Sequence, residues 1–202
     1  MMHALALVLG LLEPRFAGAD TTYGRIDGDL SLSIGAGTSI GPRGLTGVAD
    51  LRLRFLETAG VFGSYEEGFG GPAEPTRLLV GGLELRPLFL GRWLQGLELQ
   101  RSFGDLLVDS FGLEIGAFAS QPQGGSFADR VGIQLGLGLE LPLMARATGL
   151  WIGLHGGVRY SDWGLGRGED TALDRALYLQ ITLAWHQTIA THLVDAFDRG
   201  SD

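Results

Sequence analysis

RVGIQLGLGLEL, residues Arg130–Leu141, alternates so that every second residue from Val131 to Leu141 is Val, Ile or Leu, with glycine or polar residues between them. A period of two indicates a β-strand with one aliphatic face and one face of small and polar side chains. The motif Gly-Leu-Glu-Leu/Ile recurs at Gly82–Leu85, Gly96–Leu99, Gly112–Ile115 and Gly138–Leu141. A soluble sandwich points its aliphatic face inward, whereas a membrane barrel turns that face to lipid and its polar face to an enclosed interior. We interpret the repeat as the second arrangement.

The composition agrees with a barrel. Of 202 residues, 45% are hydrophobic and only 19% are charged, yet no segment approaches the roughly 20 apolar residues of a membrane helix. The 34 glycines occur inside the candidate strands as well as in turns, which suits a crowded barrel interior. The absence of cysteine excludes disulfides and thiolate metal sites. The formal net charge of −8 argues against nucleic acid as a partner.

The chain divides into three segments: a signal peptide at 1–19, a barrel at 20–187 and a C-terminal tail at 188–202. The signal peptide is indicated by the short apolar stretch His3–Leu12 and by the small-x-small cleavage site Ala17-Gly18-Ala19. In the tail, four apolar residues recur at helical spacing and predict a short amphipathic helix: Ile189, Leu193, Ala196 and Phe197.

The barrel segment contains eight candidate strands of alternating character. They are Tyr23–Ile40, Leu45–Glu57 (extendable to Tyr65), Arg77–Leu88, Trp93–Ser102, Leu107–Ala119, Arg130–Leu141, Leu150–Arg159 and Arg175–His186. Their lengths match the roughly 10 residues that a tilted membrane strand needs. The fold class expected is therefore all-β, a closed antiparallel eight-stranded transmembrane barrel.

On these features the chain resembles the small eight-stranded outer-membrane β-barrels of Gram-negative bacteria, over about Tyr23 to His186. Aromatic residues near the strand ends stand where such barrels carry their girdles: Tyr23, Phe89, Trp93, Phe103, Phe111, Trp151, Tyr160, Trp163 and Trp185. The resemblance implies a location in the cell outer membrane, contact with outer-membrane lipid and lipopolysaccharide, insertion by the barrel assembly machinery, and a monomer without a cofactor. The chain departs from these barrels in continuing past His186, because their last strand usually closes with a terminal aromatic residue.

With the N-terminus on the periplasmic side, the loops Ser120–Asp129 and Ser161–Asp174 lie outside the cell, where such barrels carry their longer loops. Glu66–Thr76 is then a long loop on the opposite side, which does not fit this assignment.

The parity of the alternation turns one set of titratable side chains inward. The set comprises Asp27, Asp29, Asp50, Arg52, Arg54, Glu84, Arg86, Glu98, Glu114, Glu140, His155 and Arg159. An eight-stranded barrel is just wide enough inside for side chains, and buried charges must be paired. We therefore expect a charge network that fills the lumen of a structural or surface-interaction barrel. Inner glycines such as Gly136 and Gly153 leave space, so a narrow small-solute channel is the alternative.

A second alternative is a lipid-modifying outer-membrane hydrolase. His155 and His186 share the inner face of adjacent strands, with Ser161, Thr182 and Glu140 nearby, and a histidine beside a hydroxyl can activate a nucleophile. Both histidines point inward, however, which favours hydrogen bonding within the charge network. The acidic loop Ser161–Asp174 matches no calcium-loop spacing, and no cofactor motif is present. We expect no enzymatic activity.

Overall fold

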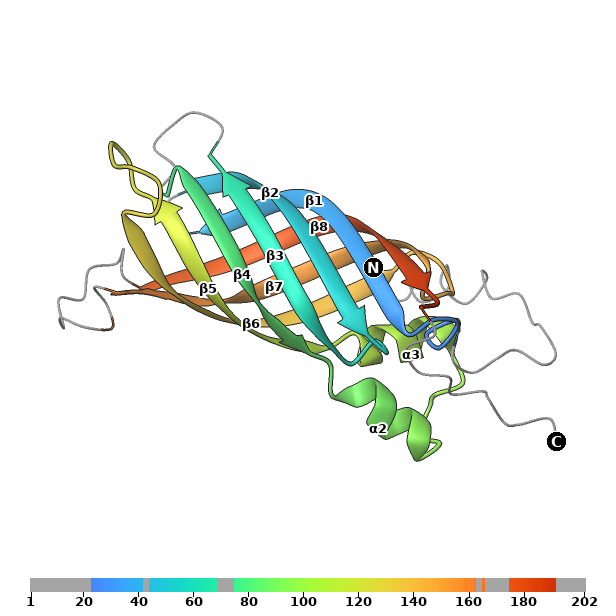
Figure 1. Ribbon diagram of the computed structural model, residues 1–202. Coiled ribbons are helices and arrows are strands. Elements are labelled where there is room, and N and C mark those ends of the chain that lie inside the picture. Colours follow the sequence, from blue (N-terminus) through green and yellow to red (C-terminus); the bar gives the residue numbers. More distant parts are fainter. Residues whose placement is uncertain (1–22, 42–43, 69–74, 163–164, 166–174, 192–202) are drawn as a thin grey trace, which may run out of the picture.

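The computed structural model describes residues 23–41, 44–68, 75–162, 165 and 175–191. Eight antiparallel strands pair in sequence order and β8 pairs with β1, so the sheet closes into a barrel (Figure 1). The strands are β1 Leu30–Gly41, β2 Gly44–Phe55, β3 Ala59–Glu67, β4 Arg77–Leu85, β5 Gly112–Gln121, β6 Arg130–Pro142, β7 Gly149–Ser161 and β8 Arg175–Ile189. The predicted closed eight-stranded barrel is confirmed.

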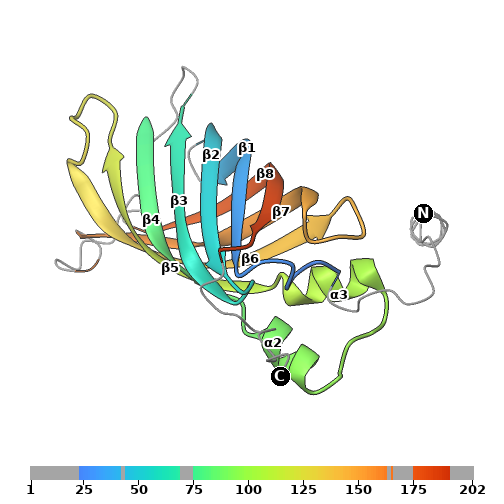
Figure 2. The same ribbon diagram turned by 45° about the vertical axis from the view of Figure 1, so that its right-hand side comes forward.

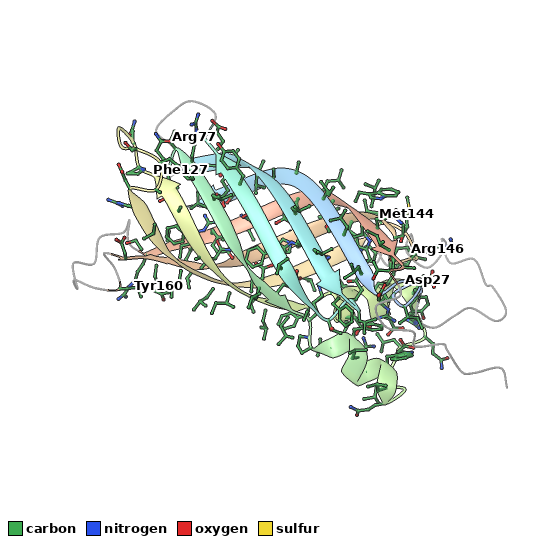
Figure 3. All side chains as sticks on the ribbon, in the orientation of Figure 1. Asp27, Arg77, Phe127, Met144, Arg146 and Tyr160 are labelled. Carbon is green, nitrogen blue, oxygen red and sulfur yellow. The ribbon has the colours of Figure 1, made fainter. Side chains whose placement is uncertain are left out.

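The two ends of the barrel differ. Two helices, α2 (Leu88–Leu94) and α3 (Ser102–Asp109), connect β4 to β5 at one end (Figure 2); we call it the helix end. The connections β1–β2, β3–β4, β5–β6 and β7–β8 lie at the opposite end, which we call the loop end. Figure 3 shows Arg77, Phe127 and Tyr160 at the loop end, and Met144 and Arg146 at the helix end.

The alternation of each strand separates two faces. On β6, Val131, Leu135 and Leu139 are exposed on the outer wall, whereas Gln134 and Glu140 are buried inside. The same division holds around the barrel, because successive side chains of a strand point to opposite faces. The interior is mostly polar, and one apolar cluster of inward side chains lies on β3, β4 and β5: Phe62, Leu78, Val80 and Phe118.

The strand predicted at Leu45–Glu57 corresponds to β2, but its extension to Tyr65 is wrong, since the chain turns sharply at Leu56-Glu57 and returns as β3. Both turn residues have positive φ, 47° and 53°, and Thr58 N–H donates to the Phe55 carbonyl at 3.0 Å. Positive φ at both central residues is the geometry of a type I′ turn, which usually contains glycine or asparagine. The extra strand also moves the connection after Glu67 to the loop end, so the long loop on the wrong side disappears.

The predicted strand Trp93–Ser102 is also wrong. Gly96, at φ +63°, ends helix α2; its N–H donates to the Trp93 carbonyl at 3.1 Å, and Leu97 N–H donates to the Arg92 carbonyl at 2.9 Å. These two bonds form a Schellman motif, in which glycine takes the left-handed position. The Gly-Leu-Glu-Leu sequence here follows a helix, and β5 starts at Gly112 instead of Leu107.

Several expectations concern the chain termini and the girdles. The signal peptide and most of the tail lie outside the described residues, and Ile189 is the last residue of β8. Among the aromatic residues expected in girdles, Phe89 and Trp151 are buried, Trp185 is exposed on the wall, and Trp163 lies outside the described residues. In the described ranges, no helix has the length and apolar character needed to cross a membrane.

Candidate functional site: the charged interior and its helical cap

The centre of the barrel is organised around Arg52. Its guanidinium binds Asp50 through Nε and Nη2 at 2.7 and 3.2 Å, Glu114 at 2.6 Å and Glu84 at 3.2 Å. His155 Nδ1 lies 2.8 Å from the same Glu114 oxygen. Asp50 and Arg52 are two residues apart on β2 and therefore share its inner face, while Glu84 and Glu114 reach Arg52 from β4 and β5.

A second group of ion pairs continues towards the helix end. Arg54 binds Glu84 at 3.0 Å and Glu140 at 2.7 Å. Arg86 binds the other oxygens of Glu84, at 2.9 Å, and of Glu140, and it also reaches Glu57 at 3.4 Å. Glu140 is thus held between two guanidinium groups, and Glu84, which also binds Arg52, is held by three. Charge-assisted hydrogen bonds of this kind fix both partners in place. We call the residues of these two groups the charge network.

A separate cluster lies nearer the loop end. Arg159 donates to Gln134 at 2.8 Å, forms an ion pair with Glu66, and lies 4.2 Å from the centre of the Tyr178 ring. Gln180 donates to the same Glu66 carboxylate at 2.8 Å. Glu66 was expected in a loop, and the missed turn at Leu56-Glu57 explains the error.

The charged side chains at the centre of the barrel are buried. Arg52 and Arg54 each expose 1% of their surface, and the network carboxylates are likewise buried. A side chain that lines an open pore would be accessible to water. Because the charges are buried and paired, each Arg satisfies carboxylates that would otherwise carry an uncompensated charge.

Helices α2 and α3, with the segment between them, form a helical cap over the helix end. Arg25, just before β1, forms ion pairs with Asp109 and, at 2.8 Å, with Glu98. Arg92 of α2 joins the two acidic residues of α3, at 2.6 Å to Asp105 and 2.5 Å to Asp109. These pairs tie α2, α3 and the chain entering β1 into one unit, and the sequence expectation contained only Glu98 of these five residues.

Asp105 also orders the chain before α3. Its carboxylate is fully buried and accepts from the backbone N–H groups of Leu99 at 2.7 Å and Arg101 at 3.2 Å. It accepts as well from the Tyr23 hydroxyl at 3.4 Å. Burial and the neighbouring Asp105 charge raise the pKa of Tyr23 to about 12. The pKa of Arg92 is raised too, because its bonds to Asp105 and Asp109 outweigh the effect of burial.

Between the cap and the barrel mouth is a small cavity of about 10 Å³, room for about one water molecule. Its lining includes Glu57 and Arg86 of the charge network and Phe89, Leu106 and Asp109 of the cap. Leu106 packs with Ala147 and Trp151 in a small apolar cluster. Little space is therefore left between the charge network and the cap at this point.

Four of the predicted lumen residues are not in the charge network, and one of them, Arg159, belongs to the cluster nearer the loop end. Asp27 is exposed at the helix end (Figure 3). Asp29 precedes β1 and accepts from the backbone and hydroxyl of Thr191, both at 2.6 Å. Glu98 belongs to the cap, because its segment is not a strand. The charge network also includes Glu57. Because Glu57 lies in the turn after β2, the alternation of strand residues could not assign its side chain to the interior.

Within the described residues, no hydrogen bond joins either histidine to a hydroxyl. His155 is bound to Glu114, and the His186 ring stacks on Trp151 with centroids 4.7 Å apart. Both rings are buried inside the barrel, so neither reaches the outer wall.

One side of the interior carries small side chains only. The inner face of β1 consists of Ser31, Ser33, Gly35, Gly37 and Ser39. A Cβ on Gly37 would lie 1.9 Å from the carbonyl oxygen of Ile181 on β8, so the close approach of β1 and β8 requires glycine there. Where β1 pairs with β8, the inner face of β1 therefore carries no charged side chain.

Comparison with known proteins gives the following. No family model and no curated protein matches the chain. Among solved structures, the chain is similar to the crystal structure of Ail, the attachment invasion locus protein of Yersinia pestis, in complex with the heparin analogue sucrose octasulfate. The similarity has a TM-score of 0.39 at 13% sequence identity and covers 78% of this chain and 97% of that one.

Proposed function

We propose that the protein is an outer-membrane β-barrel with a sealed, charge-filled lumen, and that it acts as a structural or surface-interaction protein without enzymatic activity. The barrel is then a rigid support that holds its loop end at the cell surface. The observation that carries this proposal is the inverted distribution of side chains, aliphatic outside and charged inside.

The outer wall exposes large aliphatic residues on all eight strands. Leu177 is 70% exposed and Leu83 is 61% exposed, and other outward aliphatic side chains, such as Val61 at 51% and Ile115 at 56%, are exposed as well. Soluble monomers rarely expose contiguous apolar patches larger than a few hundred Å². A wall of this kind is favourable only against an apolar surrounding, and lipid supplies it around the whole circumference.

The loop end has the features of a membrane rim. Tyr160 of β7 stands opposite Arg175 of β8, whose guanidinium lies 5.8 Å from the ring centre. On the far side, Tyr65 and Arg77 share hydrogen bonds to Glu67. Tyrosine is favoured at the headgroup level, and arginine is suited to bind phosphate. These pairs support contact with outer-membrane lipid and lipopolysaccharide at the loop end.

The sealed interior supports a barrel that does not conduct. Both the charge network and the cap stand across the path from the loop end to the helix end. A monomer inserted by the barrel assembly machinery is part of the same proposal, since the β1–β8 pairing closes the sheet within one chain.

The first test places charge on the wall. Leu137 is an outward residue of β6, and Leu137→Arg should lower the free energy of unfolding in phospholipid vesicles by about 2–4 kcal/mol if it faces the bilayer centre. Phe127→Arg, in the exposed β5–β6 connection, is the matched control and should change little. If Leu137→Arg is as harmless as the control, the wall faces water and the membrane proposal is wrong.

The second test is planar-bilayer recording of the full chain, together with lipid A mass spectrometry after overexpression. We expect silent membranes and unchanged acyl chains. Steady conductance would show that the lumen is a channel, and a lost acyl chain that depends on His155 or His186 would show a hydrolase.

A further inference from the structure

We propose that α2 and the segment following it, to Gln100, lie in the headgroup region of the membrane leaflet at the helix end, with Leu94, Leu97 and Leu99 in contact with lipid. This inference rests on the proposed membrane location of the barrel. It assigns to the helical cap a second role beyond closing the barrel mouth, that of an interfacial anchor.

The charges of this segment are all turned away from its surface. Residues 87–100 contain two ionisable side chains, Arg92 and Glu98. Arg92 is bound to both acidic residues of α3, and Glu98, whose side chain is only 8% exposed, is bound to Arg25 at 2.8 Å. The outward surface of the segment therefore presents no free charge to its surroundings.

The same surface presents leucines. Leu94 is 73% exposed, Leu97 58% and Leu99 56%. A single exposed leucine needs no explanation, but three within six residues, in a segment whose own two charges are both paired, form an apolar patch. The exposure of these leucines equals that of the outward leucines on the barrel wall, such as Leu83.

The patch adjoins the wall along the chain. Leu85, the last residue of β4, is exposed on the wall and pairs with the equally outward Leu113 of β5, and α2 begins three residues after Leu85. Figures 1 and 2 both draw α2 beyond the helix end of β4, farther from the strands than α3. A short helix with one apolar surface at that level fits the boundary between headgroups and acyl chains.

Trp93 also supports contact of this segment with lipid. Its ring stacks with that of the buried Phe89, with centroids 6.2 Å apart, and it is half-buried at the edge of the cap. Tryptophan is enriched at membrane interfaces. A lipid surface therefore accounts for the leucines, the pairing of both charges within the segment and the aromatic residue together.

The experiment uses the absence of native cysteine. Leu94→Cys, Leu97→Cys and Leu99→Cys are made singly in the full chain, spin-labelled, and reconstituted into vesicles of phosphatidylcholine and phosphatidylglycerol. Collision of the label with oxygen and with a water-soluble nickel complex is then measured. Leu183→Cys on the outer wall is the lipid control, and Phe127→Cys in the β5–β6 connection is the water control.

We expect the three cap labels to collide more with oxygen than with nickel, like Leu183→Cys and unlike Phe127→Cys. Labels that favour nickel at all three cap positions, while Leu183→Cys favours oxygen, would overturn the inference and leave the barrel in the membrane. A nickel-favouring Leu183→Cys would overturn the membrane location itself. Cap labels shielded from both oxygen and nickel would show that a protein surface covers these positions. Spin–spin broadening that disappears on dilution with unlabelled chain would identify that protein as a second copy. Either result would overturn the lipid contact.

Discussion

The backbone N–H of Glu140 donates to the hydroxyl oxygen of Ser110 at 2.9 Å, so a side chain from the end of α3 replaces a missing strand neighbour. The pairing of β5 with β6 ends at Gly112 and Gly138, and Glu140 lies beyond it. The same hydroxyl lies 2.8 Å from the Glu140 carbonyl. The cap is thus attached to the strand that carries a central carboxylate of the charge network.

Removing this hydroxyl should weaken the protein measurably. Ser110→Ala leaves a buried N–H without a partner, which costs about 1–3 kcal/mol, and we expect that loss in urea unfolding of the detergent-solubilised protein. Ser126→Ala, in the exposed β5–β6 connection, serves as the control. Equal stability of the two variants would show that water replaces the hydroxyl and that the attachment is unimportant.

Arg52 should be the most sensitive charge in the barrel. Arg52→Met leaves Asp50, Glu84 and Glu114 without their shared cation in a sealed interior, and breaking a buried ion pair costs about 3–5 kcal/mol. Arg77→Met breaks the exposed pair with Glu67, which contributes at most about 1 kcal/mol. Samples of the two variants are heated to a series of temperatures before electrophoresis. The variants are compared by the temperature at which the band of the folded form disappears. A smaller effect for Arg52→Met than for Arg77→Met would contradict the network.

Substitution by alanine should impair folding at one glycine and leave it unchanged at another. In Gly37→Ala the new methyl group meets the Ile181 carbonyl of β8, a backbone atom that cannot rotate away, so we expect a loss of about 1–3 kcal/mol or more and poor closure. Gly81→Ala finds no atom within 4 Å of its Cβ and should fold normally. The yield of heat-modifiable protein after refolding measures both. Normal yield of Gly37→Ala would mean that β1 and β8 are farther apart than described.

Tyr23 should make the cap sensitive to strong alkali. Its pKa is raised from 10.0 to about 12, so the folded state favours the neutral phenol. The stabilisation is complete below pH 10, where the unfolded chain is also neutral, and is lost as the pH rises from 10 towards 12. The near-ultraviolet phenolate absorbance of the wild type minus that of Tyr23→Phe should titrate with a midpoint near 12. A midpoint at 10 would show that Asp105 and burial do not act on this hydroxyl.

The outward and inward faces of the true strands could be predicted from sequence, because a period of two fixes orientation as soon as a strand exists. Arg52, Glu84, Glu114, Glu140 and His155 were all assigned to the inner face, where the structure places them. What alternation could not supply was the existence of each strand. Gly96–Leu99 has the same local pattern as Gly138–Leu141, but a Schellman motif, a hydrogen-bonded feature of the preceding helix, decides its structure.

The missed strand has a different cause. Leu56 and Glu57 take left-handed conformations that their side chains disfavour, so the sequence contains no turn signal between β2 and β3. Inventing one strand and missing another left the count at eight. The errors moved Glu66 and Glu98 to the wrong environments, and they hid the cap, whose ion pairs join residues up to 84 positions apart.

The small inner face of β1 also bears on the order in which the barrel is made. Arginine and carboxylate partners of the network come from β2, β4, β5 and β6 and from the turns beside them, while β1 brings serine and glycine, and β8 brings Gln180, Thr182 and His186 inward. The ion pairs can therefore all form within a curved sheet that is still open between its first and last strands. If β1 and β8 join last, that step moves no unpaired charge of the network, and we expect it to meet a lower barrier than it would if the network spanned the β1–β8 junction.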